Sequence, residues 1–388
     1  MAVPRSPRTP LPAGYWTIWT TVALDLVGFG IIVPILGRYA ERYGASGLQV
    51  GLLFASFSLA QLISAPLLGR LSDRIGRKPV IIISLVGTAL GSVLTGAATA
   101  LWMLFLGRIV DGASGGSLAV AQAAVTDIST PEQRPKLLGM LGAAFGVGFV
   151  VGPALGGLAS LGGVHLPFYV AAAIAAINAV AAWIRLPETR SGEITRRGGL
   201  RAPTQPVLRH LAVVGFITVV SFVAFEATFS LFGNARFGLT EGSTSVVFLC
   251  IGVVLVAIQG GGYGRLVAWL GVQRLFVGGI ALVAAGLLLM SAAVTWPMLI
   301  VALALLTVGQ GCAAPSLTSL VSQHAPAERR GEALGFQQSA GALGRVLAPP
   351  VAGSLYDGVG IGSPYAAGGL LCVVGVVLAI GWRLHRAE

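Results

Sequence analysis

Twelve long apolar runs constrain this chain more than any other feature of its sequence. Each run is roughly 20 residues long, which is enough for an α-helix to cross a hydrocarbon core about 30 Å thick. Because the runs consist of Gly, Ala, Leu and Val rather than short alternating segments, they predict membrane-spanning helices and not a β-barrel. The runs cover residues 15–36, 49–69, 79–97, 101–122, 137–158, 165–184, 211–233, 244–263, 274–293, 296–320, 333–355 and 364–382.

The amino-acid composition is typical of a protein that lies in a lipid membrane. Only 10% of the 388 residues are charged, whereas a soluble domain averages about 25%. The three cysteines stand alone in apolar runs, with no C-x-x-C pattern and no neighbouring histidine. We therefore predict neither a disulfide framework nor a metal site.

The net charge of +11 follows from topology. Most of the 25 Lys and Arg residues lie in the termini and in the connectors that share one side with them. This asymmetry predicts that both termini of a multi-pass membrane chain are cytoplasmic. Contact with anionic lipids explains the remaining basic charge, so we expect no nucleic-acid partner.

The longest polar stretch divides the chain into two similar halves. Gly264-Arg265-Leu266 and Gly271 repeat Gly69-Arg70-Leu71 and Gly76 at an offset of about 195 residues. Parallel repeats of this kind place a substrate site at the interface of the halves, near the bilayer midplane. The predicted divisions are a cytoplasmic tail (1–14), a six-helix bundle (15–185), a cytoplasmic linker (186–210), a second six-helix bundle (211–383) and a cytoplasmic tail (384–388).

Besides Asp111, four charged residues fall well inside the apolar runs: Asp25, Arg108, Glu226 and Arg345. A charge at this depth is costly, and each is therefore a candidate functional residue. Structural alternatives remain open. A neighbouring helix could satisfy Asp25, Asp111 could neutralise Arg108 from position i+3, and Glu226 could pair with Arg345.

Polar and aromatic residues at the same depth are predicted to line a substrate cavity. The aromatic rings would supply apolar and cation–π surface, although only some of them can face one cavity. All four histidines fall at helix ends or in connectors, so we expect carboxylates to carry any proton. The predicted cavity residues are Gln61, Phe222, Phe225, Phe229, Gln259, Gln338 and Arg345.

The connector Gly69–Lys78 is short and strongly basic. Asp73 within it can accept hydrogen bonds from Arg74 or Arg77, and Asp127 at the end of a later run could pair with either arginine. Glycines permit the turns at its two ends. The plainest interpretation is a loop that only orients the helices. The candidate gate residues are Gly69, Asp73, Arg74, Gly76, Arg77, Lys78 and Asp127.

The run 137–158 carries small residues at helical spacing, with a proline among them. Such a stripe permits close helix contact, and the proline bends the helix. Helix packing alone would explain it. The residues are Gly148, Gly152, Pro153, Gly156 and Gly157.

The connector resembles the signature G-x-L-[SA]-D-R-x-G-R-[KR] of the major facilitator superfamily, where it joins helices two and three. Residues 148–157 resemble the helix-five signature of its antiporters. Together with 24–34 and 107–112, these segments are similar to the twelve-helix drug:proton antiporters, the tetracycline efflux proteins above all.

This resemblance implies an all-α membrane fold of two six-helix pseudo-repeat halves that works without a cofactor, as a monomer, on the proton gradient. It implies that Asp73 and Arg77 stabilise the outward-open state. It also implies that Arg108 takes part in proton coupling, and that Asp25 and Glu226 bind protons or cations.

This sequence differs from the tetracycline pumps at two places that bear on the choice of substrate. Tetracycline pumps carry an aspartate in helix three, whose matching place here is near Gly91, and a histidine in helix eight that residues 244–263 lack. We therefore expect efflux of lipophilic, cationic or zwitterionic small molecules or drugs, with tetracycline itself disfavoured. A proton-coupled symporter or facilitator of a small metabolite is the alternative. A non-transporting receptor lacks support, and no nucleophile–base pair, metal cluster or phosphate loop suggests an enzyme.

Overall fold

The computed structural model describes residues 11–130, 133–190, 205–326 and 329–384, and within these ranges the chain is helical with no strand. Most of the predicted N-terminal tail (1–10), linker (191–204) and C-terminal tail (385–388) lies outside the described residues. The helices are α1 (Tyr15–Glu41), α2 (Gly47–Ile75), α3 (Arg77–Gly96), α4 (Leu101–Ser114), α5 (Ser117–Ile128), α6 (Arg134–Ser160), α7 (Leu166–Arg185), α8 (Pro206–Phe237), α9 (Glu241–Ala257), the π-helix η1 (Ile258–Gly262), α10 (Tyr263–Leu270), α11 (Val272–Ser291), α12 (Trp296–His324), α13 (Arg330–Gly358) and α14 (Ser363–Leu384).

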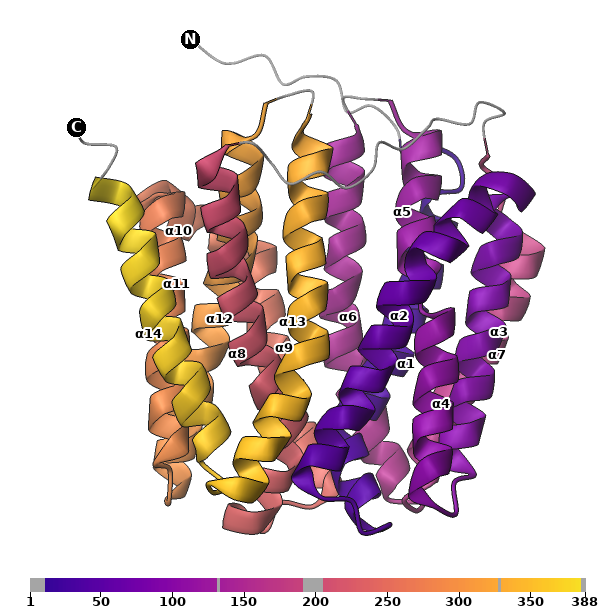
Figure 1. Cartoon of the computed structure of the whole chain (residues 1–388). Coiled ribbons are helices and arrows are strands. Elements are labelled where there is room, and N and C mark those ends of the chain that lie inside the picture. The colour runs from indigo at the N-terminus through magenta and orange to yellow at the C-terminus, as the bar shows by residue number, and fades with distance from the viewer. Residues whose placement is uncertain (1–10, 131–132, 191–204, 327–328, 385–388) are drawn as a thin grey trace.

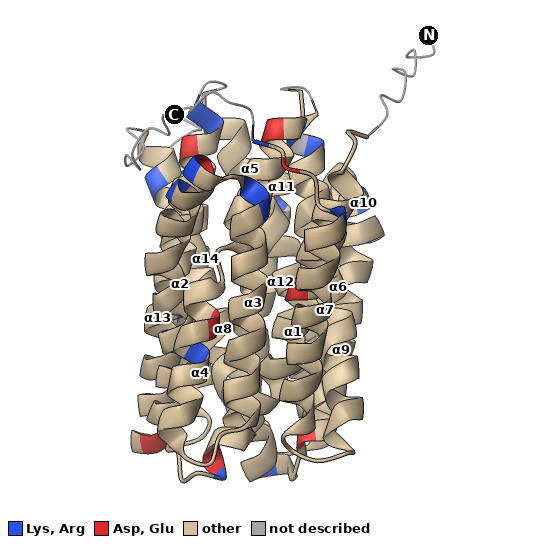
Figure 2. Ribbon diagram, turned by 90° about the vertical axis from the view of Figure 1, so that its right-hand side faces the viewer, with Lys and Arg blue, Asp and Glu red and all other residues tan. Residues whose placement is uncertain are grey.

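The helices form a bundle whose length suits a membrane. Within the described ranges, ten helical segments are long and apolar enough to cross one. The remaining two predicted spans are α4 with α5, which are individually short, and α13, which carries several polar and charged residues. Charged residues gather at the two ends of the bundle, with few between them (Figure 2). The predicted all-helical membrane fold is confirmed.

The basic connector is shorter than the sequence suggested. Helix α2 continues to Ile75 and α3 begins at Arg77, so that Gly76 alone separates them. Its φ of 106° lies in the region that favours glycine. Gly271, with φ 78°, separates α10 from α11 in the same way, and the predicted internal repeat therefore extends to the backbone.

The predicted continuous helix over residues 101–122 is interrupted between α4 and α5. Gly115 and Gly116 lie at the interruption, where the helical hydrogen-bond ladder stops. Side chains of α2 take up carbonyl groups there: Gln61 Nε2 donates to Gly115 O at 2.9 Å, and Ser64 Oγ donates to Gly112 O at 3.3 Å. Two adjacent glycines weaken the helix, and polar groups from a neighbouring helix make the break tolerable within a membrane.

Two groups of helices pack internally and against each other. Helices α1 with α6, α3 with α7 and α2 with α4 pack within the first half, and α8 with α13, α11 with α12 and α11 with α14 within the second. The halves meet chiefly through α2 with α13 and α6 with α9. In Figure 1, α2 and α13 converge at the lower end and diverge towards the upper end.

We call the end that contains Gly76 the basic end, and the end that contains Gly47 the opposite end. At the opposite end the backbones of the two halves touch. A methyl group on Gly51 would collide with the carbonyl of Pro349, and one on Gly353 would collide with that of Gly47. These glycines therefore permit α2 and α13 to approach more closely than larger residues would.

Polar contacts join the halves at this same end. Asp357 at the end of α13 accepts hydrogen bonds from the amides of Gly47 (2.9 Å) and Leu48 (2.8 Å), which begin α2. Arg42 Nη2 lies 2.7 Å from Glu241 Oε1, which joins the end of α1 to the start of α9. All of these contacts between the two halves lie at the opposite end.

Glycines of α6 and α13 lie beside open space towards the basic end. Methyl groups placed on Gly139 and Gly142 of α6, or on Gly331 and Gly335 of α13, would find no atom within 4 Å. The interface between the halves is therefore closed at the opposite end and open towards the basic end.

We predict that Asp357→Ala loosens the opposite end, because two amide hydrogen bonds to a carboxylate are lost. A cysteine at position 245 reports this loosening, because Ser245 is fully buried beside Gly157 at the interface between the halves. The exposed Cys250 is first changed to serine, so that it does not react. Modification of the cysteine at position 245 by a membrane-impermeant maleimide should become roughly ten- to a hundredfold faster in Asp357→Ala, from a loss of about 1.5–3 kcal/mol.

Glu41→Gln is the matched control, since the ion pair of Glu41 is with Arg38 inside α1 and not with the second half. An unchanged labelling rate in Asp357→Ala would contradict the assignment.

Candidate functional site

Arg77 organises the basic end. Its Nη1 donates to Asp73 Oδ1 at 2.5 Å and to Ser72 Oγ at 2.7 Å, and its Nε donates to Asp127 Oδ2 at 2.8 Å. The side chain thereby ties the end of α2 to the end of α5. The sequence left Arg74 and Arg77 as alternative partners of these acids, and the structure selects Arg77. Arg74 is exposed and offers its carbonyl instead.

Glu188 is a member of this cluster that the sequence did not reveal. Its carboxylate accepts from the amides of Arg77 (2.9 Å) and Lys78 (3.2 Å) at the start of α3. Arg190 donates to the carbonyl of Arg74 at 2.6 Å. A carboxylate at a helix N-terminus satisfies free amides and complements the helix dipole. The segment after α7 therefore holds the α2–α3 junction in place.

Asp25 lies half-buried on α1 and meets the break between α4 and α5. Ser117 Oγ, on the first residue of α5, donates to Asp25 Oδ2 at 2.5 Å. The neighbouring helix thus offers the carboxylate a hydroxyl and not a positive charge. No motif contains Ser117, so sequence reasoning could not have selected it.

Arg108 and Asp111 form an ion pair inside the first half. Arg108 Nη1 lies 2.7 Å from Asp111 Oδ2, and both side chains are buried. The Arg108 guanidinium also stacks over the ring of Phe57, 4.1 Å from its centroid, but its Nε has no hydrogen-bond partner. The structural alternative raised for Arg108 is therefore realised in this conformation.

Glu226 and Arg345 are less closely paired than Arg108 and Asp111. The two side chains lie close enough to interact electrostatically, yet they form no ion pair within 4.0 Å among the described residues. Glu226 Oε1 is buried without a hydrogen-bond partner. Arg345 is exposed although it lies in the middle of α13, on the same helix face as the exposed Gln338. Facing lipid would be costly for both, so they face the space between the halves.

The predicted aromatic lining is partly wrong. Phe225 and Phe229 are fully buried and pack against Phe248 of α9, so neither can face a cavity in this conformation. Their positions on α8 direct them into the core of the second half. Phe222 is half-buried on the same helix and remains available.

Gln61 and Gln259, two of the predicted cavity residues, lie in different surroundings. Gln61 uses its amide to hold the carbonyl at the α4–α5 break. Gln259 is exposed within the π-helix η1. Single-turn π-helices inside longer helices frequently accompany functional sites.

The small residues of α6 bring that helix against α1 next to Asp25. Methyl groups on Gly148 and Gly152 would lie 2.8 Å from Leu26 Cβ and 2.6 Å from Gly30 Cα, and Gly156 similarly abuts Ile31. Gly157 instead approaches Ser245 of α9, across the interface between halves. The stripe, with Pro153 inside the helix, therefore serves packing both within the first half and between halves.

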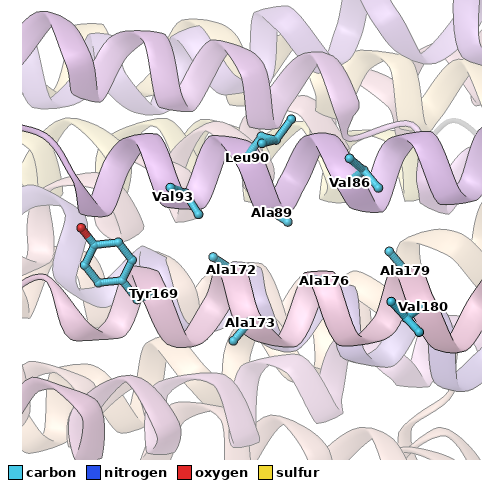
Figure 3. A pocket seen from close by; sticks show the side chains of 10 residues that line it. All are labelled: Val86, Ala89, Leu90, Val93, Tyr169, Ala172, Ala173, Ala176, Ala179 and Val180. Carbon is cyan, nitrogen blue, oxygen red and sulfur yellow. The ribbon is translucent and has the colours of Figure 1, made fainter.

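A separate groove lies on the outside of the first half. It has a volume of about 480 Å³ and runs between α3 and α7, from Tyr169 to Val180 and Val86, past several alanines (Figure 3). Its lining is apolar and its larger side chains face outwards, as expected of a surface covered by lipid. No charged residue lines it. The groove is therefore not the candidate site.

The geometry agrees with what the chain is similar to. Residues 18–271 and 262–388 match the sequence model of the Major Facilitator Superfamily. The chain belongs to the Major Facilitator Superfamily. Multidrug resistance protein 2 of Bacillus subtilis (strain 168) is 29% identical over 383 residues, 95% of each chain. Tetracycline resistance protein, class E, of Escherichia coli is 31% identical over 353 residues, 87% of this chain and 86% of that protein.

A solved structure supports the fold of this superfamily member. A bacterial homolog of the human lysosomal transporter Spinster, in an inward-facing and unoccupied conformation, gives a TM-score of 0.72 at 16% identity and covers 94% of both chains. The resemblance read from the sequence is confirmed. The protein is a multi-pass membrane transporter and not an enzyme.

We predict that Arg77→Lys destabilises this superfamily transporter, because an ammonium group cannot reproduce the planar fork that reaches Asp73, Ser72 and Asp127. One lost hydrogen bond to a charged group corresponds to about 1.5–3 kcal/mol. The melting temperature of the detergent-purified protein should fall by several degrees.

Arg70→Lys is the control, because Arg70 is exposed near the end of the neighbouring helix α2 and should tolerate the change. Equal melting temperatures for the two variants would contradict the role given to Arg77.

Proposed function

We propose that the protein exports lipophilic, cationic or zwitterionic small molecules in exchange for protons. The observation that carries this proposal is the contrast between Arg108, which has an acidic partner, and Asp25 and Glu226, which have no ion-pair partner among the described residues. Carboxyl groups that are buried without a cation are easily protonated, because an apolar environment favours the neutral form.

The proposed orientation places the basic end in the cytoplasm. Arg70, Arg74, Arg77 and Lys78 lie there, and cytoplasmic connectors carry an excess of Lys and Arg. Both termini would then be cytoplasmic, and relatives from bacteria favour the inner membrane as the location. With this orientation the interface described above is open to the cytoplasm, where a substrate for export is collected.

The charges at the interface favour a cationic partner. Arg108 and Asp111 neutralise each other. Asp25 and Glu226, when ionised, leave two negative charges against the single positive charge of Arg345. A cation or a proton would compensate the excess negative charge, and one can therefore displace the other. The half-buried Phe222 would add apolar and cation–π surface.

Transport would follow from movement of the two halves. A substrate that enters from the cytoplasm displaces the proton, and the halves then close at the basic end and separate at the opposite end. Protons from outside neutralise the carboxylates and favour the return. The proton gradient supplies the energy without a cofactor, and one chain contains both halves, so we propose a monomer.

Tetracycline is not the substrate that the site favours. Gly91 marks the place of the helix-three aspartate in tetracycline pumps, and here α3 and α4 leave no room for one. A side chain at Gly91 would place its Cβ 2.8 Å from the Asp111 amide and the Gly107 carbonyl. The name of Multidrug resistance protein 2 fits a broader set of substrates.

Everted membrane vesicles with an acidic interior test the proposal. Ethidium, norfloxacin and tetracycline are added in turn, and the pH gradient is followed with a fluorescent amine. Ethidium or norfloxacin should dissipate the gradient through the wild-type protein. Asp25→Asn and Glu226→Gln should abolish this response, whereas Glu332→Gln, which changes an exposed acid on α13, should retain it.

Full proton-coupled transport by Asp25→Asn or Glu226→Gln would remove that residue from the mechanism. No response to any of the three compounds, with folded protein present, would favour the alternative of a metabolite symporter or facilitator.

A further inference from the structure

Among the described residues, Ser117 is the polar group that lies directly on the Asp25 carboxylate. Its hydroxyl lies 2.5 Å from Asp25 Oδ2, across the contact between α5 and α1, and the serine is buried. Ser117 lies outside the signature segments 24–34, 69–78, 107–112 and 148–157. Its contact with Asp25 is therefore known from the structure and not from those signatures.

The interruption between α4 and α5 accounts for the position of Ser117. Gly116 precedes it, and Ser117 is the first residue of α5. Gln61 of α2 donates a hydrogen bond to the carbonyl of Gly115, so a second helix besides α1 holds the break. The start of α5 is thereby kept in a defined place from which the hydroxyl meets the α1 carboxylate.

We propose that Ser117 is the positioning residue that allows Asp25 to gain and lose its proton reversibly. A hydroxyl can donate a hydrogen bond to a carboxylate and accept one from a carboxylic acid. It can therefore satisfy both protonation states of Asp25. A cation in its place would hold the group ionised, and an alkyl side chain would stabilise neither state. This inference rests on the proposed role of Asp25 as a proton carrier.

The other charged groups around α1 do not perform this task. Asp111 on α4 is near enough for its charge to act on Asp25, but it is bound to Arg108. Glu226 lies on α8, which also packs against α1, and belongs with Arg345. The remaining described charged groups on helices packed against α1 occupy helix ends: Asp127 on α5, Arg134 and Lys136 on α6, Arg185 on α7, Arg209 and Arg236 on α8, Glu241 on α9, and Arg70, Asp73 and Arg74 on α2.

The protonation of Asp25 can be followed without a substrate. Infrared difference spectra of the purified protein, recorded against pH, contain a carboxylic C=O band for each acid that titrates. The band that is absent from Asp25→Asn belongs to Asp25. In Ser117→Ala the ionised form loses a hydrogen bond to a charged group and the acid form loses a weaker one, so the midpoint of this band should move to higher pH by about one unit.

Ser117→Thr is the matched variant. It retains the hydroxyl and should titrate within a few tenths of a pH unit of the wild type. Melting temperatures of both variants show that each is folded. A midpoint in Ser117→Ala equal to that of the wild type would overturn the inference, as would an equal shift in both variants, because the hydroxyl would then not be responsible.

The same proteins separate this inference from the proposed function. Proton-coupled transport that survives in Asp25→Asn vesicles would overturn the role of Asp25 in transport, whatever the infrared titration gives. Loss of transport in Asp25→Asn together with an unshifted band in Ser117→Ala would leave the function intact and overturn the role of Ser117 alone.

Discussion

The cost of placing a charge inside a membrane governs the arrangement of this protein. Each charged group at that depth must be paired, hydrogen-bonded or placed against water between the halves. Arg108 meets the requirement through Asp111 and Phe57, Asp25 through Ser117, and Arg345 through exposure at the interface. Glu226 meets it least, because one carboxylate oxygen is buried without a partner. The groups that are least well satisfied are those we assign to proton exchange.

The two ends of the molecule use their charges in different ways. At the basic end, Arg77 joins α2 to α5 within one half, and this network leaves the halves free to separate. At the opposite end, Asp357 joins α13 to α2 across the halves. In this conformation, the hydrogen bonds described between the halves therefore lie at the opposite end. Alternating access requires that such contacts can break at that end when the halves close at the basic end.

Much of the fold was predictable from the sequence, because apolar runs and glycine spacing report local geometry. The membrane helices and the repeat of Gly76 at Gly271 are of this kind, since each depends on neighbouring residues alone. The intramembrane charges were also predictable, because their cost marks them in any sequence.

Pairings between distant segments could not be predicted. Glu188 follows α7 and caps α3, and Ser117 meets Asp25 only because α4 breaks beside α1. The break itself needs Gln61 from another helix. The sequence does not distinguish Phe225 and Phe229 from Phe222, because all three are phenylalanines within one apolar run. The structure distinguishes them, since Phe225 and Phe229 pack against Phe248 of α9 in the core.

The central claim is that one site binds either a cation or a proton. Adding ethidium to the purified protein in weakly buffered detergent, with a pH indicator present, tests it most directly. The account predicts that ethidium binding releases protons, and that Asp25→Asn and Glu226→Gln each reduce this release. Binding of ethidium with no release of protons from the wild-type protein, measured from neutral to mildly acidic pH, would contradict it.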